Sequence, residues 1–326
     1  MKILAVDDDP IILELLVQFM EAIGDHDLVT ANSGQEALEI IKTAEIDRFD
    51  CFMLDIQMPA MDGIELAGRI HATARYADAP ILMLTAMSEK RYIDSAFAAG
   101  ATDYVTKPFE ISELSARIRV VADLVKARQS RTKKIFSTQA LNQRAGENTG
   151  TALHEPLTLH DVDNVIECIA MENYVAQLSR SALFGSTVFG FTIRQIEAFH
   201  AEMSAFEFRS LIEDTAEVIS DTLMGRQFLM SYSGNGTFVC IVESGWRPDM
   251  AGLMDQVNLS LSRSELYDNS GQRIEPRVCT GEAIRLVWKT GDQVMDALAQ
   301  AQASAEQAAI NYERSMSDLF QYGRIA

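Results

Sequence analysis

Three carboxylates, a hydroxyl and an amine lie where short apolar runs end in the first third of the chain. Asp7 and Asp8 follow residues 2–6, Asp55 follows residues 50–54, Thr85 closes residues 81–85, and Lys107 follows residues 103–106. Carboxylates that meet at one place repel each other unless a cation neutralises them, and a small set of hard oxygen ligands suits Mg²⁺. An aspartate in such a site could attack phosphorus as a nucleophile, while the metal, the amine and the hydroxyl hold the growing charge. These residues therefore predict phosphoryl transfer, with Asp55 as the acceptor.

The apolar runs that carry these residues alternate with helical patterns. Strands are expected at residues 2–6, 28–31, 50–54, 81–85 and 103–106, and helices at residues 10–22, 34–44, 63–74, 89–99 and 112–126. Strands that are apolar along their length and alternate with helices indicate a parallel sheet covered on both faces. Sites in such sheets form outside the carboxyl ends of the strands, which is where the chemical residues are expected to meet.

Four short motifs carry a resemblance to a known family. They are Val6-Asp7-Asp8-Asp9-Pro10, Leu54-Asp55-Ile56-Gln57-Met58-Pro59-Ala60-Met61-Asp62-Gly63, Leu84-Thr85-Ala86 and Lys107-Pro108-Phe109. In order and position, over residues 1–125, they resemble the receiver domains of two-component response regulators. The resemblance implies a five-stranded parallel, doubly wound, flavodoxin-like α/β fold. It also implies that a sensor histidine kinase or a phosphotransfer protein phosphorylates Asp55.

The resemblance further implies a metal site and a switch. The expected Mg²⁺ ligands are Asp8, Asp55, the backbone carbonyl of Gln57 and, largely through water, Asp7. The residues expected to read the phosphoryl group are Lys107, Thr85 and Tyr104. The bond between Lys107 and Pro108 is expected to be cis, which a proline permits. Such a receiver can also catalyse its own phosphorylation and dephosphorylation.

Other interpretations of nearby residues stay open. Asp9 and Asp62 are expected to cap the helices that follow them, and Tyr104 could be an ordinary edge-strand aromatic. The methionines near the site are expected to be packing residues: Met53, Met58, Met61, Met83 and Met87.

The composition limits the classes of function. The net charge is −19, so the surface should repel nucleic acid and anionic membrane unless a basic patch overrides it. No apolar run approaches the ~20 residues that a membrane span needs, and the acidic start does not resemble a signal peptide. The cysteines show neither metal nor disulfide spacing and are expected to be reduced thiols: Cys51, Cys168, Cys240 and Cys279. A cytoplasmic protein with no membrane segment is expected.

Residues 126–156 are expected to be a basic helical extension followed by a linker. Residues 126–146 contain lysines and arginines and no acid, and residues 145–156 have the composition of a loop. The basic stretch could contact RNA or an acidic partner, or it could be a solvated helix extension. A signalling helix that joins two receivers is also possible, although heptads are not sustained beyond Val125.

Residues 157–326 are expected to form an α+β output domain that begins with a helix. Helices are expected at residues 159–178, 205–223, 250–262 and 292–312, and strands at residues 187–193, 228–232, 237–242 and 277–285. This order resembles the GGDEF domain of diguanylate cyclases, a ferredoxin-like fold. The resemblance is carried by Gly234-Asn235-Gly236-Thr237-Phe238 in a predicted hairpin, by Cys279-Thr280-Gly281 and by the alanine-rich helix.

The departures from that family matter for activity. Thr192, Arg194, Gly236 and Thr237 stand where the family carries acids, and a cyclase needs carboxylates there for metal. The Arg-x-x-Asp inhibitory motif is also absent from residues 222–229. We therefore expect a noncatalytic domain that acts by protein–protein contact. The alternative is an active cyclase, with acids from elsewhere, or a sensor of GTP or cyclic di-GMP. The glycine-rich turn could admit phosphates or simply be a hairpin turn.

A DNA-binding output is a different class of hypothesis. Residues 150–326 contain 12 Lys+Arg and 24 Asp+Glu, a net charge of −12, which is the wrong sign for phosphate contacts. No helix-turn-helix pair with a basic face is evident, so no DNA contact is expected. A phosphate sink without output also remains possible. A phosphorylation-dependent homodimer is implied by the family, and the downstream protein partner is not indicated.

Overall fold

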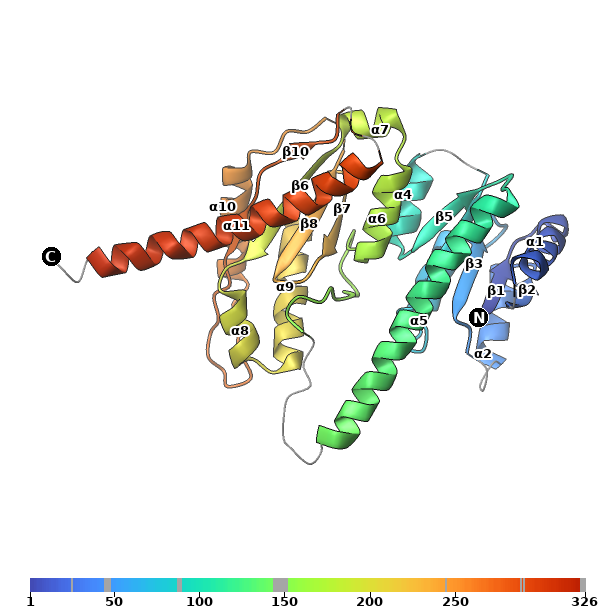
Figure 1. Ribbon diagram of the computed structural model, residues 1–326, viewed down its shortest axis with the longest axis horizontal. Helices are drawn as coiled ribbons and strands as arrows, with labels where there is room; N and C mark the ends of the chain where they lie inside the picture. The colour runs from blue at the N-terminus through green and yellow to red at the C-terminus, as the bar shows by residue number, and fades with distance from the viewer. Residues whose placement is uncertain are drawn as a thin grey trace. The chain divides into compact units, whose positions relative to one another are not determined.

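The chain folds into two compact units, Met1–Gly146 and Glu147–Ala326, in the computed structural model (Figure 1). The structure describes residues 1–24, 26–43, 48–86, 90–142, 152–243, 245–287, 289 and 291–322. Met87, most of the loop expected at residues 145–156, and single end residues of two predicted helices lie outside these ranges. Each unit contains its own sheet.

The first unit contains a five-stranded parallel sheet in the order β2-β1-β3-β4-β5. Its strands are β1 (Lys2–Val6), β2 (Asp27–Ala31), β3 (Cys51–Asp55), β4 (Ile81–Thr85) and β5 (Asp103–Thr106). Each strand lies within one residue of its predicted position. The prediction succeeds because strands covered on both faces are apolar along their length, and every residue of β3 and β4 is buried.

Helices cover this sheet on both faces (Figure 1): α1 (Pro10–Ile23), α2 (Gly34–Thr43), α3 (Gly63–His71), α4 (Lys90–Ala98) and α5 (Ile111–Asn142). α1 and α5 share one apolar layer, in which Leu16, Met53 and Leu114 are fully buried. α2 contacts β1 and α3, and α3 contacts β3. α5 continues to Asn142 and so includes most of residues 126–146, for which a basic helical extension was expected.

Aspartates fix the starts of two of these helices. Asp9 Oδ1 accepts the N–H of Ile11 at 2.9 Å, and Asp62 Oδ1 accepts the N–H of Glu65 at 2.7 Å. Each carboxylate satisfies an amide that has no partner inside its helix. The capping roles predicted for Asp9 and Asp62 are therefore confirmed.

The second unit is built on an antiparallel sheet. Its strands are β6 (Thr187–Ile193), β7 (Phe228–Tyr232), β8 (Thr237–Val242), β9 (Val278–Thr280) and β10 (Ile284–Arg285). β8 lies between β7 and β6, while β9 and β10 pair with the other edge of β6. The single strand predicted at residues 277–285 is thus two short ones. The break occurs because the N–H of Glu282 donates to Ser304 Oγ at 2.7 Å rather than to β6.

Two helical layers sandwich this second sheet. α9 (Ala205–Leu223) and α10 (Met250–Arg263) share a buried core with the strands, and α11 (Asp292–Tyr322) packs on β6, β8 and β9 beside α6 (Cys168–Gln177) (Figure 1). A Cβ on Gly190 of β6 would lie 3.0 Å from Ala305 Cβ. The alanines of α11 are therefore needed for close packing on β6. Two short helices, α7 (Arg180–Gly185) and α8 (Ile196–Glu202), were not predicted from the sequence.

The prediction of a helix over residues 159–178 is wrong in its first half. α6 begins only at Cys168, and residues 152–167 have no helical structure. Asp161 and Asn164 both have φ of 61°, a left-handed conformation that interrupts a helix. Leu159 and Ile166 are nevertheless buried in the core, so the apolar spacing reflects an irregular buried segment. No helix in the described part of the chain is long and apolar enough to cross a membrane.

Candidate functional site

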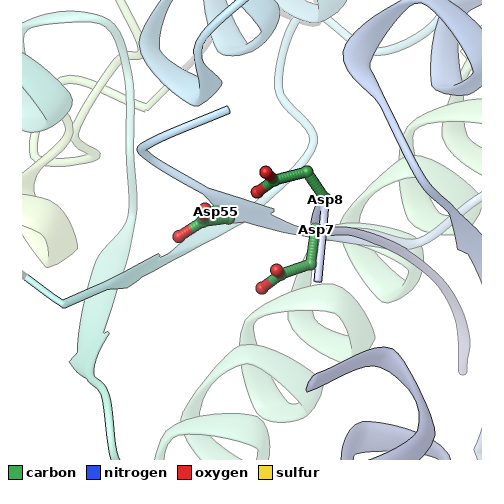
Figure 2. A group of neighbouring side chains, drawn as sticks. All are labelled: Asp7, Asp8 and Asp55. Atoms are coloured by element: carbon green, nitrogen blue, oxygen red, sulfur yellow. The ribbon is translucent and has the colours of Figure 1, made fainter. Parts of the chain in front are cut away.

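Asp7, Asp8 and Asp55 form the candidate site (Figure 2). Asp7 and Asp8 follow β1 and Asp55 ends β3, and these strands are neighbours in the parallel sheet. One oxygen from each carboxylate lies within 4.8 Å of the others, and the described residues hold no other metal-binding cluster of this kind. Asp7 is fully buried and Asp55 is 5 % exposed, whereas Asp8 is exposed. The cluster is therefore open to solvent at Asp8.

Lys107 bridges the two buried carboxylates. Its Nζ donates to Asp7 Oδ2 at 2.5 Å and to Asp55 Oδ1 at 2.8 Å. Lys107 follows β5, and its backbone N–H donates to the carbonyl of Thr85 at 2.6 Å. Since one ammonium faces three carboxylates, the cluster keeps a net negative charge.

The pKa values of both bridged groups, Asp55 and Lys107, are raised. The pKa of the Asp55 carboxyl is raised because burial penalises its charge; Lys107 lowers it, and Asp7 and Asp8 add repulsion. Burial lowers the pKa of Lys107, but its hydrogen bonds to Asp55 and Asp7 outweigh burial, so that pKa is also raised. The site thus holds its ammonium firmly and still disfavours the charge on Asp55.

The remaining predicted site residues surround this cluster. Gln57 is exposed and lines an open hollow together with Asp8 and Tyr92. Thr85 is fully buried at the end of β4, beside β3. Tyr104 of β5 is 9 % exposed, and its ring meets the ring of Phe97 edge-on at 6.2 Å. The peptide bond between Lys107 and Pro108 is cis, as expected.

Gly63 lies directly against the backbone of Asp55. A Cβ on Gly63 would lie 2.1 Å from the carbonyl oxygen of Asp55. The N–H of Gly63 donates to the carbonyl of Ile56 at 3.0 Å. α3 can therefore begin against the strand that carries Asp55 only if residue 63 has no side chain. The sequence had given Gly63 no role beyond starting a helix.

One protein family accounts for this arrangement. The family model of the response regulator receiver domain matches residues 3–119. Residues 3–119 are a response regulator receiver domain. The receiver domain holds the three aspartates, Thr85, Tyr104 and Lys107, and its fold is the flavodoxin-like α/β fold that the motifs implied.

Known proteins match the chain in part. The transcriptional regulatory protein YvrH of Bacillus subtilis is 40% identical over 118 residues, 36% of this chain and 47% of that protein. The DNA-binding dual master transcriptional regulator RpaA of Synechocystis is 36% identical over 120 residues, 37% of this chain and 48% of that protein. A structure of the chemotaxis protein CheY4 of Vibrio cholerae is 33% identical, with a TM-score of 0.35, and covers 37% of this chain and 97% of that one. The chain spans about half the length of these curated relatives.

An ion pair that the sequence did not reveal lies beside Tyr104 in the receiver domain. Asp103 is 1 % exposed, and its Oδ2 lies 3.2 Å from Arg117 Nη1 of α5. Asp103 Oδ1 also accepts the N–H of Tyr104 at 2.8 Å. The pair joins β5 to α5. Its partners are brought together by tertiary packing, so their spacing carried no signal.

In the second unit, the positions where the GGDEF resemblance predicts acids hold uncharged or cationic groups. Thr192 Oγ1 and Thr237 Oγ1 are 2.9 Å apart and buried. Arg194 lies over the ring of Tyr312, with its guanidinium carbon 3.7 Å from the ring centroid, and it donates to Cys279 Sγ at 3.2 Å. The two hydroxyls bond to each other, Thr237 Oγ1 also lies 3.5 Å from Glu306 Oε1 of α11, and the arginine is engaged in packing.

The hairpin turn between β7 and β8 is the turn predicted from Gly234-Asn235-Gly236. All three residues have positive φ, of 91°, 51° and 69°, as such a turn requires. Its amides donate within the protein: Ser233 to Thr237 O, Asn235 to Leu153 O, Gly236 to Tyr232 Oη and Thr237 to Gly234 O. These amides are therefore not available to bind a phosphate.

We predict that Gly63→Ala destabilises the receiver domain by at least ~2 kcal/mol, because the new methyl group would overlap the backbone of Asp55. Gly68→Ala is the matched control on the same helix. A Cβ there meets nothing within 4 Å, so it should stabilise by about 0.5–1 kcal/mol. Urea unfolding followed by circular dichroism measures both. Both tryptophans, Trp246 and Trp288, lie in the second unit, so their fluorescence identifies its transition. Equal effects of the two variants would contradict the steric role of Gly63.

We predict that Asp55→Asn stabilises the receiver domain at pH 7 in the presence of a chelator. A folded-state pKa above the unfolded value means that the native state binds more protons, so stability is lost as the pH rises above the ordinary carboxyl pKa of about 4. Asparagine at position 55 does not ionise, so the variant does not lose this stability as the pH rises. The difference between variant and parent should therefore shrink as the pH is lowered toward 4. Asp62→Asn, which exchanges one good helix cap for another, is the control for the substitution itself and should change the stability at pH 7 little. An Asp55→Asn variant less stable than the parent at pH 7 would contradict the argument.

Proposed function

We propose that the chain is a response regulator whose receiver domain accepts a phosphoryl group on Asp55. A carboxylate oxygen of Asp55 attacks the phosphorus of a phosphohistidine on a sensor kinase or a phosphotransfer protein. A P–O bond forms, the P–N bond breaks, and the histidine nitrogen leaves with the electron pair. The observation that carries the proposal is the Asp55 carboxylate, held by Lys107 beside Asp7 and Asp8 in a receiver domain.

Mg²⁺ is the cofactor that fits this cluster best. Three carboxylates within 4.8 Å and an exposed Asp8 offer hard oxygen ligands with room for water, which Mg²⁺ prefers. Asp8, Asp55 and the carbonyl of Gln57 would hold the ion, and Asp7 would act largely through water. When bound, the ion supplies the positive charge that Lys107 alone does not provide.

The switch is assigned to Lys107, Thr85 and Tyr104. Lys107 donates to Asp55 Oδ1. When Asp55 carries a phosphoryl group, Lys107 can donate to a phosphoryl oxygen instead, because that oxygen is bonded next to the Asp55 carboxylate. Thr85 ends the strand next to Asp55, and Tyr104 lies on the strand beyond it. New charge at Asp55 would therefore act on β4 and β5. It would also act on α4, because Phe97 of α4 contacts Tyr104 of β5. A local charge that biases a two-state element is the expected logic.

The output is proposed to be a protein contact made by a noncatalytic, GGDEF-like second unit. In support, its strands follow the β-α-β-β-α-β order of the ferredoxin-like folds, with β6 central and β9, β8 and β7 around it. Thr192 and Thr237 pair with each other where a cyclase would need carboxylates. The metal-binding cluster found among the described residues belongs to the receiver domain.

A DNA-binding output has less support. The name of the Synechocystis relative describes that protein as DNA-binding, but the match covers 48% of it. Residues 150–326 carry a net charge of −12, which opposes phosphate contacts. A mobility-shift assay with mixed-sequence DNA at low salt separates the two classes, since a DNA-binding output would retard the DNA.

Phosphorylation is tested by substituting Asp55. We predict that Asp55→Asn abolishes phosphate incorporation from acetyl phosphate or a phosphorylated kinase in the presence of Mg²⁺, because the amide is not a nucleophile. Asp62→Asn is the matched control, since Asp62 caps α3 and lies outside the cluster; it should retain incorporation. The measurement is acid-stable, base-labile phosphate by mass spectrometry. Phosphate incorporation into Asp55→Asn at the level of the parent would contradict the assignment of Asp55 as the phosphoryl acceptor.

The proposal that the second unit is noncatalytic is tested by incubating the chain with GTP. We predict that the full chain, incubated with GTP and Mg²⁺ and with or without a phosphodonor, forms no cyclic di-GMP. Thr192 and Thr237 offer hydroxyls where two metal ions would need carboxylates. Chromatography of the nucleotides checks this, with an active diguanylate cyclase as the positive control. Any cyclic di-GMP above the blank would overturn the noncatalytic assignment.

A further inference from the structure

A hollow of about 480 Å³ lies where β6 ends in the second unit. Its lining comes from three directions: Arg194 follows β6, Arg277 precedes β9, and Phe199 and Tyr312 belong to α8 and α11. A volume of this size is within the range of sites that bind small molecules. Phosphorylation of Asp55 uses none of these side chains, so the hollow is a separate feature of the molecule.

Two arginines lie opposite each other at this hollow. The antiparallel register of β6 and β9 pairs Ile193 with Val278. One residue further along, the N–H of Arg194 donates to the carbonyl of Arg277 at 2.7 Å, so the two arginines occupy directly opposed positions. Side chains at such positions project from the same face of a sheet, and like charges there repel each other. The pair therefore places two mutually repelling cations beside the hollow.

Neither arginine is neutralised by a close carboxylate in the described part of the chain. Arg194 lies over the ring of Tyr312 and donates to two uncharged acceptors, a thiol and a backbone carbonyl. No carboxylate of the described residues lies within 4.0 Å of it. Arg277 is 4.0 Å from Glu275, and an exposed ion pair of this kind contributes little. An anion bound between the two guanidinium groups would relieve their repulsion.

The rest of the lining selects the kind of anion. Phe199, Tyr312 and Met316 supply apolar surface, and a methionine side chain adapts its shape to an aromatic ring. Glu275 and Glu313 also line the hollow, and their two negative charges equal the two positive charges of the arginines. A dianion such as a phosphate ester is therefore repelled more strongly than a monoanion such as a carboxylate.

We propose that this hollow is a binding site for a small aromatic carboxylate. The carboxylate accepts hydrogen bonds from Arg194 and Arg277, because the planar N–H groups of arginine match the two oxygens of a carboxylate. The aromatic body packs against the apolar side chains of α8 and α11. The site lies within the second unit, so its ligand gives that unit an input of its own. This inference goes beyond the proposed protein contact and does not depend on Asp55.

The first test is a titration of the full, unphosphorylated chain with 2-naphthoate, a flat aromatic carboxylate, followed by NMR of the methionine methyl groups. The Met316 methyl signal, assigned through Met316→Leu, should shift with a Kd on the order of 1 mM or tighter. The methyl signal of Met20, which is buried in the receiver domain, should not shift. An unchanged Met316 signal at ligand concentrations far above this Kd would overturn the proposal.

Two analogues test whether the charge is recognised. The neutral 2-naphthamide should bind at least about tenfold more weakly than 2-naphthoate, because it lacks the charge that the guanidinium groups bind. At pH 8, where a phosphate ester is a dianion, 2-naphthyl phosphate should also bind more weakly. Binding of the amide as tight as that of the carboxylate would show apolar adsorption and would contradict an anion site.

The second test changes the charges of the lining. Arg277→Gln should weaken the binding of 2-naphthoate by about tenfold, because it removes a charged hydrogen-bond donor. Arg285→Gln is the matched control, since Arg285 is an exposed arginine on β10 outside the hollow; it should leave the Kd unchanged. Glu275→Gln should strengthen the binding of both anions, and that of 2-naphthyl phosphate more. Parental affinity in Arg277→Gln, or weaker binding in Glu275→Gln, would overturn the proposal.

The methyl signal of Met171, a buried residue of the same unit, reports whether each variant is folded. If Arg277→Gln loses this signal, Arg277→Lys replaces it under the same criteria, since lysine keeps the charge but lacks the planar pair of donors. The titrations use no phosphodonor and no GTP. Their failure leaves the phosphorylation of Asp55 untouched, and failure of that phosphorylation leaves these results standing.

Discussion

One ammonium group facing three carboxylates is the constraint on which the receiver domain depends. The Lys107 Nζ binds Asp7 and Asp55, which brings together the ends of β1, β3 and β5. The neighbouring order of β1, β3, β4 and β5 in a parallel sheet makes this possible. Burial raises the pKa of Asp55, Lys107 lowers it, and Asp7 and Asp8 raise it further, so that the pKa stays above its ordinary value. A domain in this state gains electrostatic stability from an added cation, and its hydrogen bonds must rearrange when Asp55 gains further negative charge.

The second unit has mainly hydroxyl groups at the corresponding buried positions. Thr192 and Thr237 are buried and share a hydrogen bond of 2.9 Å, and Thr237 also donates to one carboxylate, Glu306, at 3.5 Å. Hydrogen-bonded hydroxyls can be buried without the repulsion that a cluster of carboxylates carries. In the proposed function, the receiver domain responds to charge, and the second unit offers a surface whose shape depends on packing and backbone hydrogen bonds.

The sequence predicts the receiver more completely than the second unit, for physical reasons. Strand positions and the convergence of Asp7, Asp55 and Lys107 follow from the pattern of a parallel sheet. Contacts between residues far apart in the sequence, such as Asp103 with Arg117 and Gly63 with Asp55, depend on how the helices pack on that sheet. The sequence pattern does not specify that packing. The segment at 159–167 shows the limit most clearly. Its apolar spacing predicted a helix, but positive φ at Asp161 and Asn164 and burial of Leu159 and Ile166 produce an irregular chain.

That irregular segment also bears on how a signal could reach the output. A ligand or modification shifts an equilibrium only by its difference in free energy between two states. Taking a population from 1:99 to 99:1 requires about 5.5 kcal/mol. Release of residues 158–166 would also expose Leu159 and Ile166 and break the backbone hydrogen bonds with Met230, which adds a further large cost. This buried segment is therefore a fixed part of the second unit, and a signal has to act through residues whose alternative states lie closer in free energy.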